Sequence, residues 1–481
     1  MGKLPLGNGR YAIVGVVAVI LLALLCNHMV YGPELNREWD PSLQETPLST
    51  SAQKIPIFQS VPPPASENST RHIEEKVQLL TRLQKSSGTY DVHHPRHRLL
   101  TALHGFYRYK QRSDDELKRV RDLYGKVTKR QKQVIESTIN HSASISQSEA
   151  LIRANDKVAQ EIVDHALSFY DIPFAELTQF IKDAEAQKPG SADRTSVSQA
   201  LKHFVRDWAA EGAHERDATF PAILSTLAGQ FPNRSADAPV RVLVPGAGLG
   251  RLAHEISALG GFEVTANEWS AYMNIAYRYL ESLSAPKRGH RSSTIHPFID
   301  WWSHQPSRAE LHRAITFPET YMDPTSVLWV EGDFIRAFNQ PREHEKFDAI
   351  VSLFFIDTAR NLMTYIETIH RLLKGPDLSS AKVSGKGGLW LNLGPLLYGS
   401  APFLQLSVEE IILLSETAGF EFLETDEKWG PLTLAGSNNH SRYTARSIEA
   451  PYGYNNNALS KNAYWAQFWL AQKGAGEGGM Q

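Results

Sequence analysis

The sequence predicts an α/β fold in which helices cover both faces of a mostly parallel sheet. From residue 240 onward, short runs rich in β-branched and aromatic residues alternate with stretches of helical periodicity. Such alternation is typical of parallel strands joined by crossover helices. A glycine-rich turn follows the first of these runs directly. These two observations predict a ligand site at the carboxyl ends of the strands.

Composition narrows the class of protein. The chain has 481 residues, of which 42% are hydrophobic, and its formal net charge is -2. This is ordinary globular composition, which excludes collagen-like and wholly disordered chains. A near-zero charge argues against a dedicated nucleic-acid-binding protein, so no nucleic acid partner is expected. Cys26 is the only cysteine, which excludes an internal disulfide and a cysteine-based zinc site, and no metal is expected.

An apolar segment near the N-terminus predicts a membrane anchor. No residue from 11 to 26 is charged, and the stretch 11–31 is about long enough to cross a ~30 Å hydrocarbon layer. A cleaved signal peptide is the alternative, but its cleavage site would be poor. A core helix is another, but the segment is apolar on all sides. The expected order is a stub (1–10), the anchor (11–31) and a proline-rich linker (32–70).

A helical region is predicted over residues 71–235. Its first part, 71–140, is rich in Lys and Arg, which is typical either of a membrane-surface or nucleic-acid patch or, as we favour, of a solvated helix face. Further helices are predicted near 152–170 and 197–208. In the last of these, the motif LKHFVRDW places His203 and Arg206 one turn apart. A simple ion pair of Arg206 with Asp207 or Glu211 is the alternative to a functional role.

The glycine turn has the arrangement of a nucleotide loop. A predicted strand at 240–244 runs into PGAGLGR, which contains Gly246 and Gly248, and a helix follows at 252–259. Glu268, at the end of the next strand, lies 22 residues after Gly246, where an acid can bind both ribose hydroxyls. Arg251 stands where the dinucleotide fingerprint needs a third glycine. The loop therefore favours S-adenosylmethionine over a dinucleotide.

Three acidic residues are predicted at strand ends. Further strands are expected at 326–330, 347–353, 388–393, near 420–424 and at 464–471, with helices at 362–373 and 407–418. Glu268, Asp333 and Asp357 each follow a strand, at the edge where ligands bind in such sheets. The alternatives are that acids often begin turns and that Asp357 caps a helix at 358–373.

Five motifs resemble the carnosine N-methyltransferase family: VLVPGAGLGRLAHEIS, ANEWS, EGDF, FFIDTARN and LWLNLGPLLYG, in this order. The similarity covers about residues 75–475, so the methyltransferase domain is expected at 236–475 with a flexible tail at 476–481. The resemblance implies a Rossmann-like class I methyltransferase fold with an N-terminal helical region. It also implies S-adenosylmethionine as methyl donor and the histidine imidazole of carnosine or a related small peptide as acceptor.

The resemblance also implies site residues. The family's acidic substrate ligand falls on Asp357, and its late substrate-contacting tyrosine falls on Tyr464. A family glutamine is replaced here by His203. The cofactor contacts that the resemblance implies fall on Arg206, Gly246, Glu268, Asp333 and Phe334, with Gly248 in the same loop.

Two departures from the family concern the acceptor. The histidine that usually follows GPLLY and touches substrate is Gly399 here, and Arg360 replaces the histidine of DTAHN. The alternatives are therefore a membrane-tethered binding module without catalysis and a protein histidine methyltransferase, and a homodimer is also left open. A neutral imidazole is a competent nucleophile, and a carboxylate such as Asp357 could hold one ring N–H.

Membrane topology is predicted only in part. Lys3 and Arg10 precede the anchor and favour a cytosolic N-terminus for a single-pass protein. Glycosylation sequons at Asn68, Asn140, Asn233 and Asn439 then slightly favour a lumenal catalytic domain. The supply of S-adenosylmethionine favours the cytosol, so the side of the catalytic domain stays open.

Overall fold

The computed structural model describes residues 67–284, 291–376, 386–399, 401–435 and 444–474. The predicted anchor at 11–31, most of the predicted linker and the tail lie outside these residues. Helix α2 begins at Glu67, three residues before the predicted end of the linker at residue 70. Within the described ranges, no helix combines the length and apolar character needed to span a bilayer.

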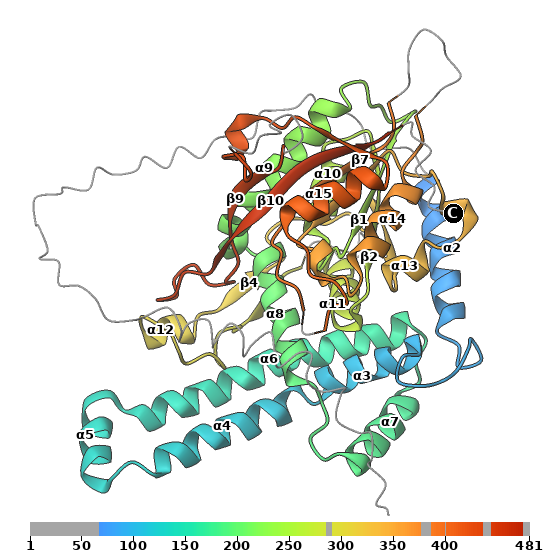
Figure 1. Cartoon of the computed structure of the whole chain (residues 1–481). Coiled ribbons are helices and arrows are strands. Elements are labelled where there is room, and N and C mark those ends of the chain that lie inside the picture. Colours follow the sequence, from blue (N-terminus) through green and yellow to red (C-terminus); the bar gives the residue numbers. More distant parts are fainter. Residues whose placement is uncertain (1–66, 285–290, 377–385, 400, 436–443, 475–481) are drawn as a thin grey trace, which may run out of the picture.

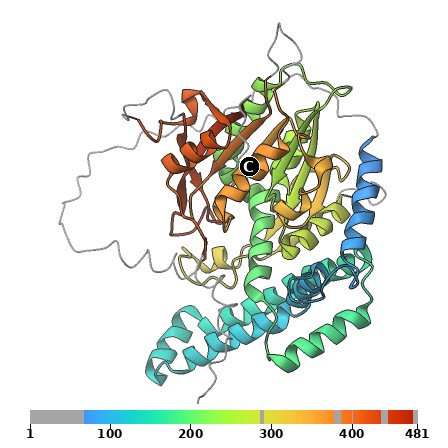
Figure 2. The ribbon, with the colours of Figure 1, turned by 45° about the vertical axis from the view of Figure 1, so that its right-hand side comes forward.

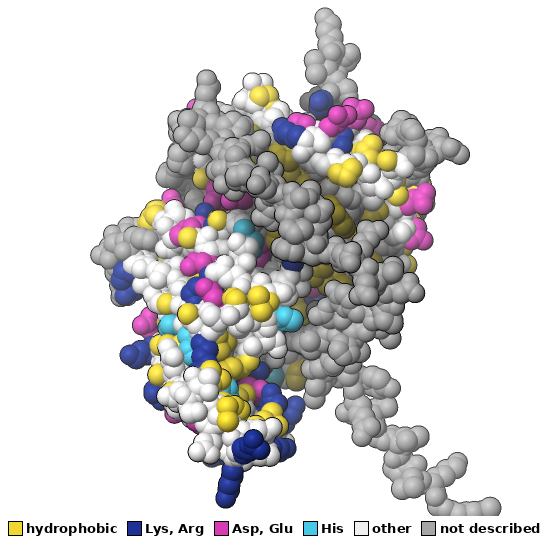
Figure 3. Space-filling model, turned by 90° about the vertical axis from the view of Figure 1, so that its left-hand side faces the viewer, with side chains coloured by type: hydrophobic (Ala, Val, Ile, Leu, Met, Phe, Trp, Pro, Cys, Tyr) yellow, Lys and Arg dark blue, Asp and Glu magenta, His cyan; other side chains and the backbone are white. Residues whose placement is uncertain are grey.

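Helices α3 to α7 of the helical region lie below the sheet in Figure 1, where α4 to α6 form a long arm, and α2 lies at its right-hand side (Figures 1 and 2). Helices α4 and α6 pack against each other along the arm, and α5 lies at its tip. Helix α5 has no buried residue, and Lys and Arg side chains gather at the lower end of the face in Figure 3. The helices of this region are α2 (Glu67–Arg82), α3 (Pro95–Tyr107), α4 (Tyr109–Gly125), α5 (Lys129–Ile139), α6 (His141–Phe169), α7 (Phe174–Gln187), α8 (Arg194–Trp208) and α9 (Ala213–Gln230), with a 3-10 turn η1 (Ala210–Gly212).

One sheet forms the body of the molecule. Its strand order is β5-β2-β1-β6-β7-β10-β8, and β9 pairs with β10. The pairs from β5 to β7 are parallel, whereas β10 runs antiparallel to β7, β8 and β9. The strands are β1 (Val240–Pro245), β2 (Phe262–Glu268), β5 (Val327–Glu331), β6 (Ala349–Leu353), β7 (Leu389–Gly394), β8 (Phe420–Leu423), β9 (Arg446–Pro451) and β10 (Ala463–Lys473).

The predicted α/β class is confirmed, with a mixed, mostly parallel sheet. Each strand predicted from the sequence is present within a few residues, but three strands were missed. Two of them form a separate small hairpin of β3 (Ser293–Ile295) and β4 (Ile315–Phe317), which are too short to show a period. Strand β9 was missed because it ends in Pro451 and alternates weakly between buried and exposed residues.

Helices cover both faces of the sheet and create two cores. Along β1, Val242 and Val244 face one core, whereas Leu243 between them faces the other. The first core also contains residues of α8 to α11, and the second contains residues of α13 to α15. The helices of the two cores not yet given are α10 (Arg251–Ala258), α11 (Ala271–Leu283), α13 (Phe334–Ala337), α14 (Leu362–Leu372) and α15 (Val408–Thr417). The short α12 (Arg308–Leu311) belongs to neither core, and the remaining 3-10 turns are η2 (Pro341–Glu343), η3 (Ile356–Thr358) and η4 (Glu427–Trp429).

A buried polar network joins the helical region to the edge strand of the sheet. The hydroxyl of Tyr170, which follows α6, donates to both carboxylate oxygens of Glu331 at 3.0 and 2.9 Å. Glu331 ends β5 and also accepts from Nε of Arg278 on α11 at 3.0 Å. Burial raises the pKa of Glu331, and the nearby charge of Arg278 opposes this shift. The network therefore fixes α6 and α11 to one end of β5.

Removing the Tyr170 hydroxyl should destabilise the fold. Tyr170→Phe leaves a buried carboxylate with one donor fewer, which costs roughly 1.5–3 kcal/mol in free energy of unfolding. Urea denaturation measures the change. Tyr124→Phe is the matched control, because Tyr124 also donates to a glutamate, Glu136, but on the exposed arm. Equal losses in the two variants would show that burial does not strengthen this network.

Candidate active site

A cavity of about 980 Å³ opens at the carboxyl ends of β1, β2, β5 and β6. The chain runs outward from β1 through β2 to β5 and then crosses back to place β6 on the other side of β1. Ligands bind at such a reversal of strand order in sheets of this kind. The structure brings seven of the nine predicted site residues to the wall of this cavity, namely His203, Arg206, Gly246, Gly248, Glu268, Asp333 and Phe334.

The glycine loop shapes the floor of the cavity. Gly246 and Gly248 have φ angles of +64° and +61°, which residues with a side chain rarely adopt. A Cβ on Gly246 would also lie 2.5 Å from the ring of Phe355. The loop is held from α8, since the carboxylate of Asp207 accepts from the Leu249 N–H at 3.1 Å and the indole of Trp208 donates to the Leu249 carbonyl at 2.7 Å.

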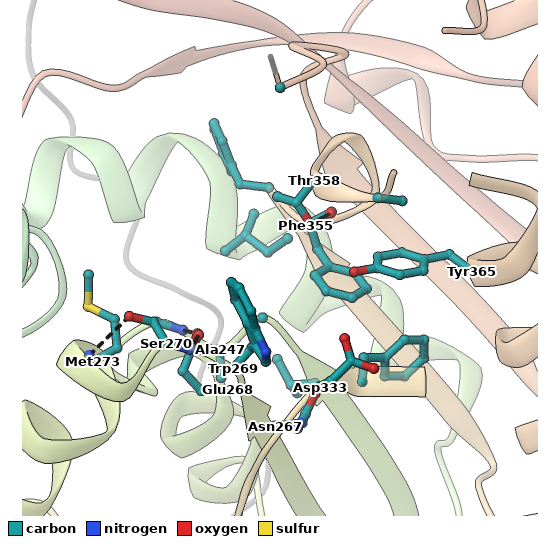
Figure 4. Close-up of a pocket in the computed structure, with 18 of the residues that line it drawn as sticks. Ala247, Asn267, Glu268, Trp269, Ser270, Met273, Asp333, Phe355, Thr358 and Tyr365 are labelled. Carbon is teal, nitrogen blue, oxygen red and sulfur yellow. Dashed lines mark hydrogen bonds between the residues drawn. The ribbon is translucent and has the colours of Figure 1, made fainter. Parts of the chain in front are cut away.

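Glu268 closes the loop from the end of β2. Its carboxylate accepts from the Gly248 N–H at 2.9 Å and from the Ser270 N–H at 2.7 Å. Burial raises the pKa of Glu268, and these backbone donors oppose the shift. Figure 4 shows Glu268, Trp269 and Asp333 along one side of the pocket, with Phe355, Thr358 and Tyr365 facing them.

Asp333 and Phe334 come from the turn after β5. The carboxylate of Asp333 caps α13 by accepting from the Arg336 N–H at 3.1 Å. The ring of Phe334 is buried and meets the rings of Phe355 and Tyr365 edge-on, each at 5.4 Å between centroids. The cap uses only one carboxylate oxygen of Asp333, so the second oxygen is available to a ligand.

Trp269 is a wall residue that the sequence did not single out. Its side chain is 57% exposed although it is large and apolar. Arg98 of α3 stacks on this ring at 3.9 Å and donates to the Trp269 carbonyl at 2.6 Å. The contact joins two segments far apart in the chain, and the only signal in the sequence was the motif ANEWS, which contains Trp269.

Arg206 and His203 project from α8, as predicted. The guanidinium of Arg206 lies 5.1 Å from the Phe354 ring and 4.9 Å from the Tyr452 ring. Its acidic neighbours are Asp207 at 3.9 Å and the buried Glu215 at 3.6 Å, not the Glu211 considered from the sequence. These contacts leave room for the guanidinium to bind a further anion, since both ion-pair distances exceed hydrogen-bond length.

Asp207 is a second residue that the sequence did not assign to the site. Burial alone would raise its pKa, but His203, Arg206 and the Leu249 N–H together hold that pKa below its usual value. Asp207 therefore stays ionised beside the glycine loop.

Asp357 and Tyr464 do not line the cavity itself but lie behind it. Asp357 sits in η3, directly before the wall residue Thr358, and its Oδ2 accepts from the Leu397 N–H at 2.9 Å. Burial raises the pKa of Asp357 to about 6. The helix-cap alternative for Asp357 is wrong, because α14 begins at Leu362 and Asn361 caps it.

An aromatic cluster lies beside Arg206. The rings of Phe354 and Tyr452 stack at 5.2 Å, and Tyr464 meets them at 6.2 and 5.9 Å. Phe354 has a φ of +51°, a conformation that costs on the order of 1 kcal/mol and turns its ring into the cavity. Glu215 fixes the segment of Tyr452 by accepting from the Gly453 and Tyr454 N–H groups at 2.9 and 2.6 Å.

Comparison with known proteins gives the family. The sequence pattern of carnosine N-methyltransferase matches residues 183–475, which is more than half of the chain. The chain belongs to the carnosine N-methyltransferase family. The family resemblance seen in the sequence, and the expected enzyme class of N-methyltransferase, are therefore confirmed.

Individual relatives agree with this assignment. The carnosine N-methyltransferase of Schizosaccharomyces pombe is 27% identical over 68% of this chain and 87% of its own. That of Rattus norvegicus is 33% identical over 57% of this chain and 66% of its own, so the match spans just under two thirds of the rat protein. A Haemonchus contortus phosphoethanolamine N-methyltransferase 2 structure is 13% identical with a TM-score of 0.31 over 59% of each chain. The fold assignment rests instead on the strand order with its reversed β10.

The buried Asp357 should lower stability at neutral pH. The pKa of its carboxyl is 3.8 in a free chain and about 6 in the fold. Between these values the unfolded chain loses the proton first, so stability falls as pH rises through this range. Asp357→Asn should therefore raise the free energy of unfolding at pH 8 by up to ~3 kcal/mol, measured by urea denaturation, and this increase should vanish near pH 4.

Asp183→Asn is the control for this experiment, because Asp183 is an exposed residue of α7. A gain for Asp357→Asn that is the same at pH 4 and pH 8 would contradict the raised pKa.

Proposed function

We propose that this chain transfers the methyl group of S-adenosylmethionine to a ring nitrogen of histidine in carnosine or a related small peptide. One observation supports the proposal most strongly. The glycine loop, Glu268 and the rings of Phe354 and Tyr452 line a single cavity, and Asp357 directly precedes the wall residue Thr358. A donor site and an acceptor site that share one cavity allow direct transfer, because catalysis here consists mainly of aligning the two reactants.

The residues present fit an adenosyl cofactor. The glycine loop lets a ligand approach the backbone where a Cβ on Gly246 would clash. We assign Glu268 to the ribose hydroxyls, since a carboxylate has more lone pairs than its two backbone donors use. Asp333 and Phe334 would flank the adenine, and Arg206 with His203 would face the carboxylate end. Gly248 forms part of the cradle.

Asp357 and the aromatic cluster suit an imidazole. The Leu397 N–H fixes the carboxylate of Asp357, and its charge acts on Tyr464, which belongs to the cluster with Phe354 and Tyr452. We assign to Asp357 the task of accepting a hydrogen bond from one ring N–H, which leaves the lone pair of the other ring nitrogen for the methyl group. A pKa of about 6 keeps this acid largely ionised at neutral pH.

The proposed methyl transfer forms one N–C bond and breaks one C–S bond. Bound S-adenosylmethionine supplies an electrophilic methyl group on a sulfonium. The imidazole lone pair forms the new N–C bond, and the electrons of the broken C–S bond remain on sulfur. The ring becomes an imidazolium, whose positive charge Asp357 stabilises and whose N–H proton it accepts. Membership of an enzyme family favours this catalytic reading over a non-catalytic binding module.

Loss of Glu268 should weaken cofactor binding. Glu268→Ala removes a buried charged acceptor worth ~1.5–3 kcal/mol, so the affinity for S-adenosylmethionine should fall at least tenfold by isothermal titration calorimetry. Glu367→Ala, an exposed change on α14, is the control. A folded Glu268→Ala protein, checked by circular dichroism, with unchanged affinity would remove Glu268 from the site.

We further propose that residues 11–31 anchor the protein in a membrane, with the N-terminus in the cytosol. The support is the uncharged segment 11–26 and the positive charges before it. A catalytic domain on the lumenal side would carry glycans on its sequons, and endoglycosidase treatment should then increase gel mobility. Digestion of that domain by protease added outside sealed microsomes, without a glycan shift, would instead place it in the cytosol.

A further inference from the structure

Three arginines line the reaction cavity, and they differ in their partners. Arg251 donates to Glu255 at 2.7 Å and to Glu319 at 3.0 Å. Arg206 has acidic neighbours in Asp207 and Glu215. Arg360 makes no ion pair with any residue that the structure describes, and no lysine lines the cavity within the same residues. Arg360 is thus a cation of the cavity wall that has no acidic partner among the described residues, so its charge is available to a ligand.

The surroundings of Arg360 fix it at the acceptor end of the cavity. Its guanidinium lies over the ring of Phe403 at 4.6 Å, and its backbone carbonyl accepts from the Phe403 N–H at 2.6 Å. Phe403 is 71% exposed, which is unusual for a large apolar ring. Gly399 lies on the same wall, and a Cβ there would meet no described atom within 4 Å.

Two of the positions that differ from the family motifs therefore line the same cavity. Arg360 and Gly399 are distant in sequence, yet both line the cavity, and the Phe403 contact ties their segments together. Asp357, in η3, precedes Arg360 by three residues in the chain. A group held by Arg360 would consequently sit beside the imidazole held by Asp357, on the side where Gly399 leaves open space.

We propose that Arg360, with Phe403 beneath it, forms a subsite for the α-carboxylate of a C-terminal histidine. The inference rests on the proposed function and narrows its substrate class. In a C-terminal histidine the carboxylate is only a few bonds from the imidazole. A single substrate residue can therefore present its imidazole to Asp357 and its carboxylate to Arg360. Arginine suits this task because its planar guanidinium binds a carboxylate through two hydrogen bonds. A histidine inside a protein chain has no carboxylate there and is disfavoured.

The test combines two substrates with three enzymes. Carnosine and its C-terminal amide are compared on the full-length protein, Arg360→Gln and Arg360→Lys, with kcat and KM measured separately. The unaltered protein should prefer carnosine to the amide by about tenfold or more in kcat/KM, because a charge-assisted pair is lost with the amide. Arg360→Gln should raise KM for carnosine about tenfold and leave the amide unchanged, and Arg360→Lys should recover part of the loss.

Controls separate this subsite from the rest of the site. Arg130→Gln, an exposed change on α5, should alter neither substrate. The affinity of Arg360→Gln for S-adenosylmethionine should equal that of the unaltered protein, and a loss there would assign Arg360 to the cofactor and overturn the proposal. Equal use of carnosine and its amide by the unaltered protein would also overturn it while leaving methyl transfer established. Transfer to neither compound, with methylation of a protein histidine, would overturn the proposed substrate itself.

Discussion

The cavity depends on the clasp between α8 and the glycine loop. Two consecutive residues of α8, Asp207 and Trp208, bind the N–H and the carbonyl of the same residue, Leu249. Buried backbone groups must find partners, and a loop rich in glycine cannot order itself at low cost. The same helix turn carries Arg206 and His203. The helical region is therefore part of the site, because its packing sets the loop and supplies the side chains that face it.

Several acids of the fold are buried, and they differ in the groups that pair with them. Asp207 lies among His203, Arg206 and a backbone N–H, which keep it ionised. Glu268 has backbone donors, and Glu331 has Arg278. Among the described residues Asp357 has no cationic partner, so burial dominates and its pKa rises to about 6. A buried carboxylate without a cationic partner is stabilised most by a ligand that brings a hydrogen-bond donor, and an imidazole ring is such a ligand. Without a ligand, the same buried carboxylate lowers the stability of the protein.

The cavity wall is built partly from strand ends and partly from loops. The floor of glycines and strand-end acids follows directly from the strand order, whereas the rest of the wall is built from the loop segments around Arg360, Gly399 and Tyr452. Loops tolerate exchange better than the strands that carry them. Different residues at positions such as 360 and 399 can therefore change the loop part of the wall without disturbing the sheet or the glycine loop.

The sequence by itself determined the α/β class, the main strands and the cofactor side of the site. These features are local: a β-branched run, a glycine turn and an acid at the next strand end each lie within about one supersecondary unit. The resemblance to the family motifs also predicted Asp357 and Tyr464 as site residues. Only the tertiary structure decided that Asp207 holds Leu249, that Arg98 stacks on Trp269 and that Glu215 positions Tyr452. Each of these contacts joins residues distant in the chain, and no periodicity or spacing records a contact that arises only when helices pack against the sheet.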